Sequence, residues 1–148
     1  MSEQKDSGAA HTRDAYAYFV PITTRWHDND IYGHVNNVVY YSYFDTAANH
    51  YLIHAGGLDI ERSDIIGVVA SSNCNYFSPV AYPDELEGAV RVGKLGNSSV
   101  TYEIAVFRRG GTQAVAAGTF THVFVTRADN RPTPVPAQIR AALEKILA

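Results

Sequence analysis

The sequence predicts an α+β domain in which one long helix is covered by a single five-stranded antiparallel sheet, with a short second helix at the C-terminal end. Between residues 40 and 52, apolar and aromatic side chains recur at the i, i+3, i+4, i+7 spacing of an amphipathic helix. After that helix the pattern changes to a period of two, with short turn signals between the segments. One helix followed by consecutive strands argues against alternating βαβ units and favours a helix on one face of a sheet.

The N-terminal part of the chain predicts a tail and then a strand. Residues 1–15 are polar and show neither period, so we expect a mobile tail, with a single domain occupying residues 16–148. Residues 16–26 are β-branched and aromatic and predict the first strand, which Pro21 places at an edge or a bulge. The glycine pair at positions 56–57 ends the long helix.

Four more strands are expected after the helix. Residues 65–80 predict a long strand with a bend, and residues 85–92, 100–107 and 112–127 predict three further strands. Glycine-containing turns separate the later strands. A proline-rich connector then precedes the apolar positions between 139 and 147, which mark the short terminal helix.

Composition favours one globular domain that acts on a small molecule. The 148 residues are 46% hydrophobic and 18% charged, with a net charge of −3, which suits one sizeable core. There is no long block of lysine and arginine to indicate a nucleic-acid or membrane partner. The single cysteine, Cys74, excludes an intrachain disulfide framework. The N-terminal residues lack the apolar core of a signal peptide, and no apolar run approaches the ~20 residues that span a bilayer, so we expect a cytoplasmic protein.

Residues 28–37, Asp-Asn-Asp-Ile-Tyr-Gly-His-Val-Asn-Asn, carry the densest group of chemically active side chains, between the first strand and the long helix. A calcium-binding loop that starts at Asp28 fails, because Tyr32 and Val39 stand where ligand oxygens are required. A transition-metal site drawn from the two histidines and two aspartates at positions 27–34 has suitable ligand types, but their spacing matches no cluster of known geometry. No metal is therefore expected.

A purely structural interpretation accounts for part of this run. Asp28 or Asp30 can end the strand in an Asx-turn, and Asn36 or Asn37 can cap the helix. Capping is the favoured role for the Asn36 side chain, since asparagine is among the preferred capping residues. One cap does not require two acids and a histidine, so Asp30 and His34 stay unexplained.

A catalytic interpretation uses the start of the helix directly. N–H groups in the first helical turn have no intrahelical acceptor and carry the positive end of the macrodipole, so they can stabilise an oxyanion that develops on a bound carbonyl. Asp30 lies close enough before the helix to act on the same group as a nucleophile or a general base. The residues therefore favour hydrolysis of an activated acyl group.

Residues 28–40, followed by Tyr43 and Phe44, resemble the signature of the hot-dog-fold acyl-CoA thioesterases of the 4-hydroxybenzoyl-CoA thioesterase type. The resemblance covers nearly the whole chain after the tail, because the order of strand, helix and four strands is also that of a hot-dog domain. Residues 95–102 also resemble the family's turn between two later strands. The resemblance implies hydrolysis of an acyl-CoA thioester, with no cofactor besides the coenzyme A of the substrate. Acyl carrier protein thioesters share the same pantetheine arm.

The resemblance also implies roles for individual residues. Asp30 is the implied catalytic nucleophile or general base, and the backbone N–H of Asn37 is implied to polarise the thioester carbonyl. Gly33, His34 and Asn36 belong to a Gly-His-Val-Asn-Asn variant of the motif that is similar to the branch acting on fatty or small acyl-CoA thioesters. His34 is expected to orient Asp30, to hydrogen-bond the loop, or to be a structural histidine.

The family implies a homodimer, often paired into a homotetramer, with each active site at the dimer interface. The residues implied to bind substrate are Gly33, Asn36 and Tyr40 in the pocket, and Arg91 and Lys94 for the phosphates of coenzyme A, which favour basic side chains. Further basic candidates are Arg108, Arg127 and Arg131.

Two other functions stay open. A non-catalytic acyl-CoA or acyl-carrier binding module can use the same pocket. An enoyl-CoA hydratase fits less well, because such sites pair Asp and His at a longer spacing, whereas Asp30 and His34 are four positions apart. Two single residues receive structural interpretations: Cys74 lacks an adjacent base and is expected to be a buried small side chain, and His122 is expected to be a hydrogen-bonded core or interface histidine.

Overall fold

The structure is a computed structural model that describes residues 11–148, which form one curved antiparallel sheet and two α-helices. Residues 1–10, the larger part of the expected tail, lie outside the described residues. In chain order the elements are η2 (Arg13–Ala15), β1 (Tyr18–Thr23), η3 (Trp26–Asp28), α1 (Val39–His54), β2 (Ile65–Ser72), β3 (Asn75–Tyr76), β4 (Glu85–Leu95), β5 (Ser99–Arg108), β6 (Ala116–Thr126) and α2 (Ala137–Glu144).

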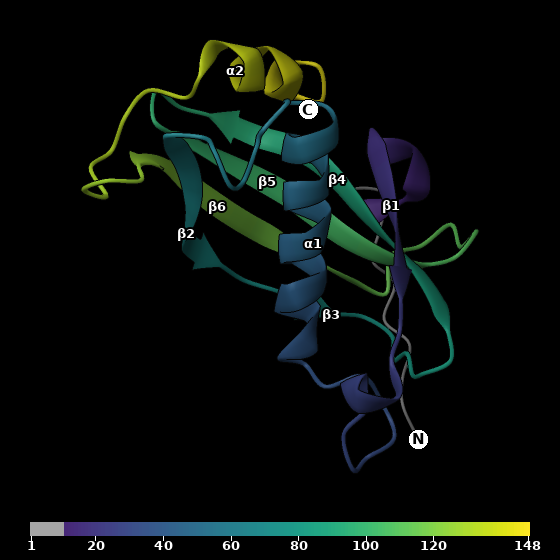
Figure 1. Ribbon diagram of the computed structural model, residues 1–148. Helices are drawn as coiled ribbons and strands as arrows, with labels where there is room; N and C mark the ends of the chain where they lie inside the picture. The colour runs from purple at the N-terminus through teal and green to yellow at the C-terminus, as the bar shows by residue number, and fades with distance from the viewer. Residues whose placement is uncertain (1–10) are drawn as a thin grey trace.

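The sheet wraps around the long helix. Its strands follow the antiparallel order β1-β4-β5-β6-β2, and β3 pairs with β6 farther along the same edge. Figure 1 shows α1 lying against the concave face of this sheet, with α2 across one end. This arrangement confirms the predicted hot-dog fold of one long helix, an antiparallel sheet around it and a short C-terminal helix.

The strand predicted at residues 65–80 is divided into two. The pairing register of β2 with β6 shifts between Val69 and Ser71, and the chain then leaves the ladder before it pairs again as β3. Five long strands were expected and are present, and the sixth, short strand is the far end of the bent segment. Period-two alternation does not show where a strand breaks, because a bulge changes the pairing and not the residue types.

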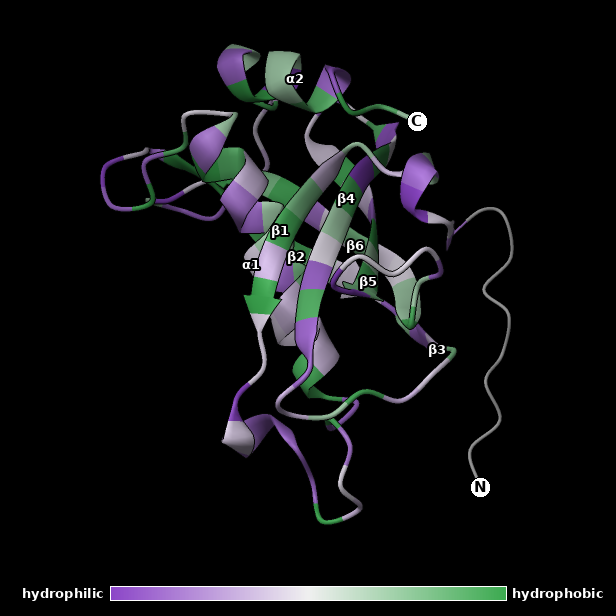
Figure 2. Cartoon of the chain, turned by 90° about the vertical axis from the view of Figure 1, so that its right-hand side faces the viewer, coloured by the Kyte–Doolittle hydropathy of each residue, from purple (hydrophilic) through white to green (hydrophobic). Residues whose placement is uncertain are grey.

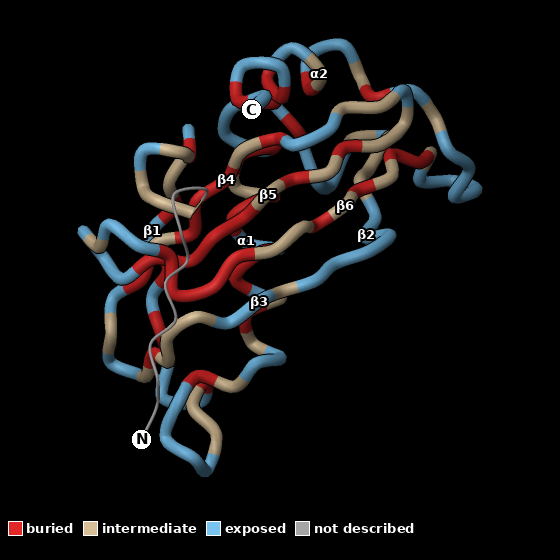
Figure 3. The backbone as a smooth tube through the Cα atoms, turned by 180° about the vertical axis from the view of Figure 1, so that it is seen from behind, coloured by how far each residue is buried: buried red, intermediate tan, exposed pale blue. Residues whose placement is uncertain are grey.

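The core lies between α1 and the concave face of the sheet. The inward side of α1 supplies Phe44, Ala47, Ala48 and Leu52, all fully buried. A Cβ atom at Gly88 of β4 would lie 3.0 Å from the Cβ atom of Ala47, so two small residues allow the close approach of helix and sheet. Figure 3 shows buried residues along β4, β5 and β6, whereas the edge strand β2 is largely exposed.

The convex face of the sheet is partly covered by the N-terminal segment of the same chain. Arg13 forms an ion pair with Glu87, and its guanidinium carbon lies 4.7 Å from the centroid of the Phe19 ring. Tyr16 is buried in a second apolar cluster on this face. Residues 11–15, which the sequence pattern assigns to the tail, thus contact the sheet, and their polar composition gives no sign of the contacts that Arg13 makes.

The second helix closes one end of the sheet. The Tyr51 hydroxyl on α1 donates a hydrogen bond to the carbonyl oxygen of Ala142 on α2. The Val92 N–H donates to the Ile146 carbonyl at 2.8 Å, which ties the chain after α2 to β4. Over the range 11–148, no helix is long and apolar enough to cross a membrane.

Candidate active site

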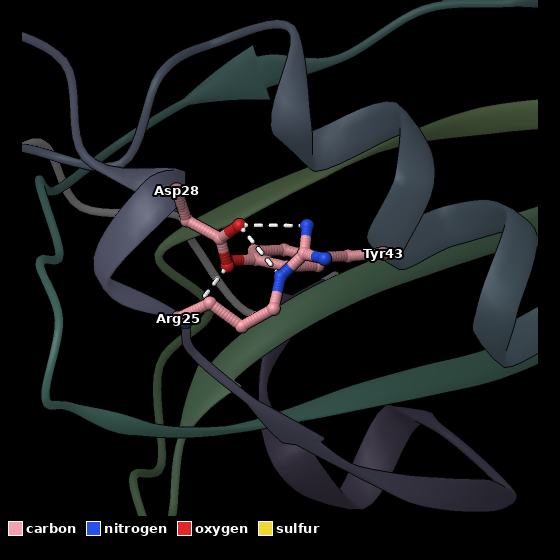
Figure 4. Close-up of polar contacts among 3 residues, drawn as sticks. All are labelled: Arg25, Asp28 and Tyr43. Carbon is pink, nitrogen blue, oxygen red and sulfur yellow. Dashed lines mark hydrogen bonds and ion pairs between the residues drawn. The ribbon is translucent and has the colours of Figure 1, made fainter.

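The loop between β1 and α1 contains the predicted catalytic run, and Figures 1 and 2 show it projecting beyond the end of the sheet. Most of this loop is hydrophilic in Figure 2, so hydrogen bonds must fix its shape. Its anchor is Asp28, which is 1% exposed. Asp28 Oδ2 accepts hydrogen bonds from the Tyr43 hydroxyl at 2.7 Å and the Arg25 N–H at 3.0 Å. Oδ1 accepts two more from the Arg25 guanidinium, at 3.1 and 3.0 Å (Figure 4).

These contacts determine the electrostatics of the anchor. Burial by itself would raise the pKa of Asp28, but the hydrogen bonds from Tyr43 and Arg25 and the positive charge of Arg25 outweigh it and lower the pKa. Burial and the hydrogen bond with Asp28 raise the pKa of Tyr43. The Tyr43 contact ties the loop to α1, and the Arg25 contacts close the turn within the loop, so Asp28 is a structural anchor.

Asp30 begins a tight turn. Its N–H donates to the His34 carbonyl at 3.0 Å, and its carbonyl accepts the Gly33 N–H at 3.0 Å. Gly33 has a φ of +84°, a left-handed conformation that glycine adopts without strain. Asp30 Oδ1 accepts the Tyr32 N–H at 2.9 Å, which confirms the expected Asx-turn. The other oxygen, Oδ2, has no hydrogen-bond partner in the described part of the chain.

The turn that leads into α1 leaves one donor free. Asn36 Oδ1 accepts the Val38 N–H at 3.0 Å and the Asn36 carbonyl accepts the Val39 N–H at 2.9 Å, so Asn36 caps this turn. The N–H of Asn37 has no acceptor among residues 11–148. It lies at the N-terminal end of a 16-residue helix, where the macrodipole favours negative charge.

One cavity of about 400 Å³ joins these two features. Its walls come from the loop, the start of α1 and the segment around β3, and they consist of Asp30, Tyr32, His34, Val35, Asn37, Tyr40, Tyr76, Phe77, Ser78 and Pro79. The structure thus brings together Asp30, His34, Asn37 and Tyr40 of the predicted site residues. Gly33 lies outside the lining and shapes the turn. The exposed imidazole of His34 has no hydrogen-bond partner within the described chain.

Tyr40 presents a polar group to this cavity. The residue is 3% exposed, and burial raises its pKa to about 12. Its ring packs edge-on against the Tyr76 ring, with centroids 5.2 Å apart. The Tyr40 hydroxyl makes no hydrogen bond within residues 11–148, yet no fully enclosed polar atom there lacks a partner. The hydroxyl is therefore open to the cavity that the residue lines.

The two basic residues predicted to bind phosphate do not line the cavity of their own chain. Arg91 pairs with Glu103 at 2.6 Å, and its guanidinium carbon lies 4.3 Å from the centroid of the Tyr16 ring on the convex face. Lys94 is exposed near the end of β4. Both side chains lie on the face of β4 that the sequence pattern predicts to be wet, but that face does not border the cavity, and the N-terminal segment covers Arg91 there.

Arg108 is the basic candidate that lies at the cavity edge. Its Nη2 donates to the Pro79 carbonyl at 2.6 Å, and its Nη1 lies 3.5 Å from the Ser78 Oγ. Both of those residues line the cavity. The other two candidates bond to residues outside the cavity lining: Arg127 to the carbonyl oxygens of Ser63 and Ile60, and Arg131 to Asp129.

Tyr76 and Phe77 bring two aromatic rings to the cavity from outside the predicted catalytic run. Tyr76 donates a hydrogen bond to a carbonyl 39 positions earlier in the chain. Local periodicity cannot predict a contact between segments so far apart in sequence. The structure is therefore needed to show that the β3 region forms part of the cavity wall.

The remaining polar features of the sequence have structural surroundings. No group of three His, Cys, Asp or Glu residues in the range 11–148 is arranged to hold a metal ion. Cys74 is partly buried, and burial raises its pKa to about 11, which disfavours a reactive thiolate. His122 is 1% exposed, with Nδ1 3.1 Å from the Tyr102 hydroxyl, which confirms the predicted hydrogen-bonded core histidine.

Comparison with known proteins identifies the family and supports the fold. A family model for the thioesterase superfamily matches residues 32–115. The PA5185 protein of Pseudomonas aeruginosa is 56% identical, the alignment covers 93% of this chain and 96% of that one, and the TM-score is 0.92. A DHNA-CoA thioesterase from Staphylococcus aureus is 22% identical with a TM-score of 0.76, over 86% of this chain and 89% of that one, which shows a shared fold. The Bacillus subtilis protein YsmA is 29% identical over 89 residues, 60% of each chain, so the match spans less than two thirds of that relative.

Proposed function

The chain belongs to the thioesterase superfamily, and from this premise we propose that it hydrolyses acyl-CoA thioesters to a free acid and coenzyme A. One observation supports this function above the others: a single cavity is lined by Asp30, with an unpartnered carboxylate oxygen, and by Asn37, whose N–H has no acceptor among the described residues. An acid oxygen and an N–H donor on one cavity can supply attack on a carbonyl and stabilisation of the resulting oxyanion.

In a nucleophilic route, Asp30 Oδ2 adds to the thioester carbon, and the carbonyl oxygen, now negatively charged, accepts the Asn37 N–H. Collapse of this intermediate breaks the C–S bond, forms an anhydride between the acyl group and Asp30, and releases the thiolate of coenzyme A, which takes a proton from water. A water molecule then hydrolyses the anhydride, which releases the free acid and restores the carboxylate.

In a general-base route, Asp30 Oδ2 takes a proton from a water molecule while the water oxygen adds to the thioester carbon. The same N–H stabilises the oxyanion, the C–S bond breaks, and the proton passes from Asp30 to the leaving thiolate. Both routes use the same two protein groups. A rapid acid quench followed by mass spectrometry separates them, because only the first forms an acyl adduct on Asp30.

The neighbouring side chains complete the proposed binding site. Tyr40 supplies a free hydroxyl from the cavity wall, and His34 lines the same cavity as Asp30, where its imidazole can orient the carboxylate or contact substrate. Gly33 and Asn36 act indirectly in this proposal, by holding the turn and the helix start in place. The cavity then takes the acyl group and the thioester together.

The phosphates of coenzyme A need a basic contact near the cavity mouth. Arg108 is placed for this within one chain, because it bonds to two residues of the cavity wall. In this proposal, Arg91 and Lys94 contact the phosphates of a coenzyme A that is bound in the cavity of a partner chain. We propose such a partner as a second copy of this chain, since Ile31, Tyr32 and Val38 around the catalytic loop are 94%, 81% and 67% exposed, an apolar surface that favours cover by protein.

The test is thiol release from short, medium, long and aromatic acyl-CoA thioesters by the wild type and by Asp30→Asn. Asparagine keeps the oxygen that accepts the Tyr32 N–H and removes only the charge and basicity, so the turn is retained. We expect turnover to fall roughly 10²–10⁴-fold with an unchanged melting temperature.

Asp59→Asn is the matched control. Asp59 Oδ1 also accepts backbone N–H groups two and three residues later, in an exposed loop after α1 and outside the cavity lining. It is expected to keep wild-type turnover. Near-normal thiol release by Asp30→Asn would contradict the assignment of Asp30. Tight acyl-CoA binding without thiol release would identify a binding module, and hydration of crotonyl-CoA would identify a hydratase.

A further inference from the structure

The segment at residues 73–78 contributes its last three residues to the cavity wall, and it is fastened on both sides of β3 to β6 and to the residue just before β6. Before β3, the Asn73 N–H donates to the Thr119 carbonyl at 3.0 Å, and the Thr119 N–H donates to Asn73 Oδ1 at 3.2 Å. After β3, the Phe77 N–H donates to the Val115 carbonyl at 2.8 Å. A Cβ atom at Gly118 would lie 1.9 Å from the Asn73 carbonyl oxygen, so only glycine permits this close approach. The segment is thus held firmly along the β6 edge of the sheet.

Tyr76 extends from this fastened segment to the start of α1. Its hydroxyl donates a hydrogen bond to the Asn37 carbonyl at 3.2 Å. The same carbonyl accepts the Tyr40 N–H at 3.3 Å, so Asn37 has two donors on its carbonyl and no acceptor on its N–H among the described residues. The edge-on contact with the Tyr40 ring holds the Tyr76 ring from a second side.

We propose that Tyr76 is a positioning residue that holds Asn37 in the orientation required of the oxyanion donor. The inference rests on the proposed hydrolysis of thioesters. The carbonyl and the N–H of Asn37 are joined through one Cα atom, so a hydrogen bond that restrains the carbonyl also limits where the N–H can point. A donor works only when it is aimed at the position that the oxyanion will occupy, and small misplacements are costly.

The alternative role for Tyr76 is a wall of the acyl pocket, and the two roles predict different kinetics. Loss of a pocket contact changes KM and depends on the acyl group that fills the pocket. Loss of donor positioning lowers kcat by a similar factor for every acyl group, because all thioesters share the same carbonyl.

The experiment compares Tyr76→Phe with the wild type on at least three acyl-CoA thioesters of different length. Phenylalanine keeps the ring and its contact with Tyr40 and removes only the hydroxyl. We expect kcat to fall about 5–20-fold for all substrates, with KM within about twofold and an unchanged melting temperature. The carbonyl ¹³C resonance of Asn37 is expected to shift, which reports the lost hydrogen bond independently of activity.

Tyr82→Phe is the matched control, because Tyr82 is 40% exposed, as against 39% for Tyr76, and its hydroxyl has no partner in the described chain. It is expected to change neither kcat nor the Asn37 resonance. A second variant, Asn73→Ala, loosens the segment without touching the cavity. It is expected to lower kcat in the same direction, and its effect should largely disappear in the Tyr76→Phe background, because both act through one contact.

Three results would overturn the positioning role: a wild-type kcat in Tyr76→Phe, a loss confined to KM, or losses that differ strongly between acyl groups. If the wild type releases no thiol from any substrate, the proposed function itself fails and the positioning role fails with it. In that case a shifted Asn37 resonance would still show that the hydrogen bond exists, which separates the two failures.

Discussion

Asp28 and Asp30 show how surroundings separate two identical side chains. Both carboxylate oxygens of Asp28 accept hydrogen bonds from Arg25 and Tyr43. Asp30, by contrast, has one oxygen without a hydrogen-bond partner in the described chain, and it lines the cavity. Two carboxylates two positions apart therefore divide into a structural anchor and a candidate catalyst. Their residue types alone do not make this distinction.

The anchor role predicts that Asp28→Asn lowers the free energy of unfolding by about 2 kcal/mol, because a buried acceptor of charge-assisted hydrogen bonds is lost. The pKa of Asp28 is lowered in the folded state, so its contribution is present above the ordinary carboxyl pKa and is lost as pH falls below it. Urea unfolding at neutral and acidic pH measures both effects.

In the variant, the loss of stability below about pH 4 should be smaller than in the wild type. Glu85→Gln is the control, since Glu85 forms an exposed pair with Arg109 at 2.9 Å and is expected to contribute little. An Asp28→Asn protein as stable as the wild type would show that the loop is not anchored through this carboxylate.

How much of the site is predictable depends on whether its parts are local in sequence. Asp30, His34, Asn37 and Tyr40 lie within eleven residues, and the onset of helical periodicity is enough to place them together at one helix start. The assignment of Arg91 has no such support. Alternation indicates that its side of β4 is wet, but not that the N-terminal segment folds over that face and provides Tyr16 for the guanidinium.

At the scale of the elements, β6 joins the core to the edge of the sheet. His122 lies buried on this strand, next to β2 in the ladder, where a Cβ atom at Gly67 would be 3.2 Å from the imidazole ring. Burial lowers the pKa of His122 to about 4. The strand therefore carries a neutral histidine whose protonation opposes folding.

The free energy of unfolding is thus predicted to fall as pH drops from about 6.5 toward 4, because His122 is protonated in the unfolded state but stays neutral in the folded state over this range. Between pH 7.5 and 5 the cost is about 2 kcal/mol. Urea unfolding of His122→Gln should show this pH dependence reduced, with His54→Gln, an exposed site, as the control. Equal pH dependence in the wild type and His122→Gln would contradict this account.

The elements themselves follow closely from the sequence, apart from one break and one boundary. Strands β4, β5 and β6 and helix α1 lie where the two periods place them, because each buries one face against a common core. The break after β2 depends on pairing with β6, which no period records. The start of the folded chain depends on Arg13, a single side chain that packs on Phe19.

At the scale of the whole molecule, the exposed apolar residues beside the site predict self-association. We expect light scattering to give two or four times the mass of one chain. Ile31→Glu places a charge at a 94% exposed position next to Asp30 and should shift the protein toward the monomer. Ile60→Glu, at a 58% exposed position after α1, is the control and should leave the mass unchanged. A wild-type monomer at micromolar concentration would contradict the proposed partner.

Helix α1 supplies the central layer of the core, and the turn that leads directly into it carries the free donor of the candidate site. Tyr43 on the same helix holds the anchor of the catalytic loop. Turnover and cooperative melting should therefore be lost over the same temperature interval, without an earlier inactivation step. A substitution on the inward face of α1 can therefore lower both stability and turnover. These positions should tolerate fewer substitutions than the inward positions of a core helix that has no catalytic role.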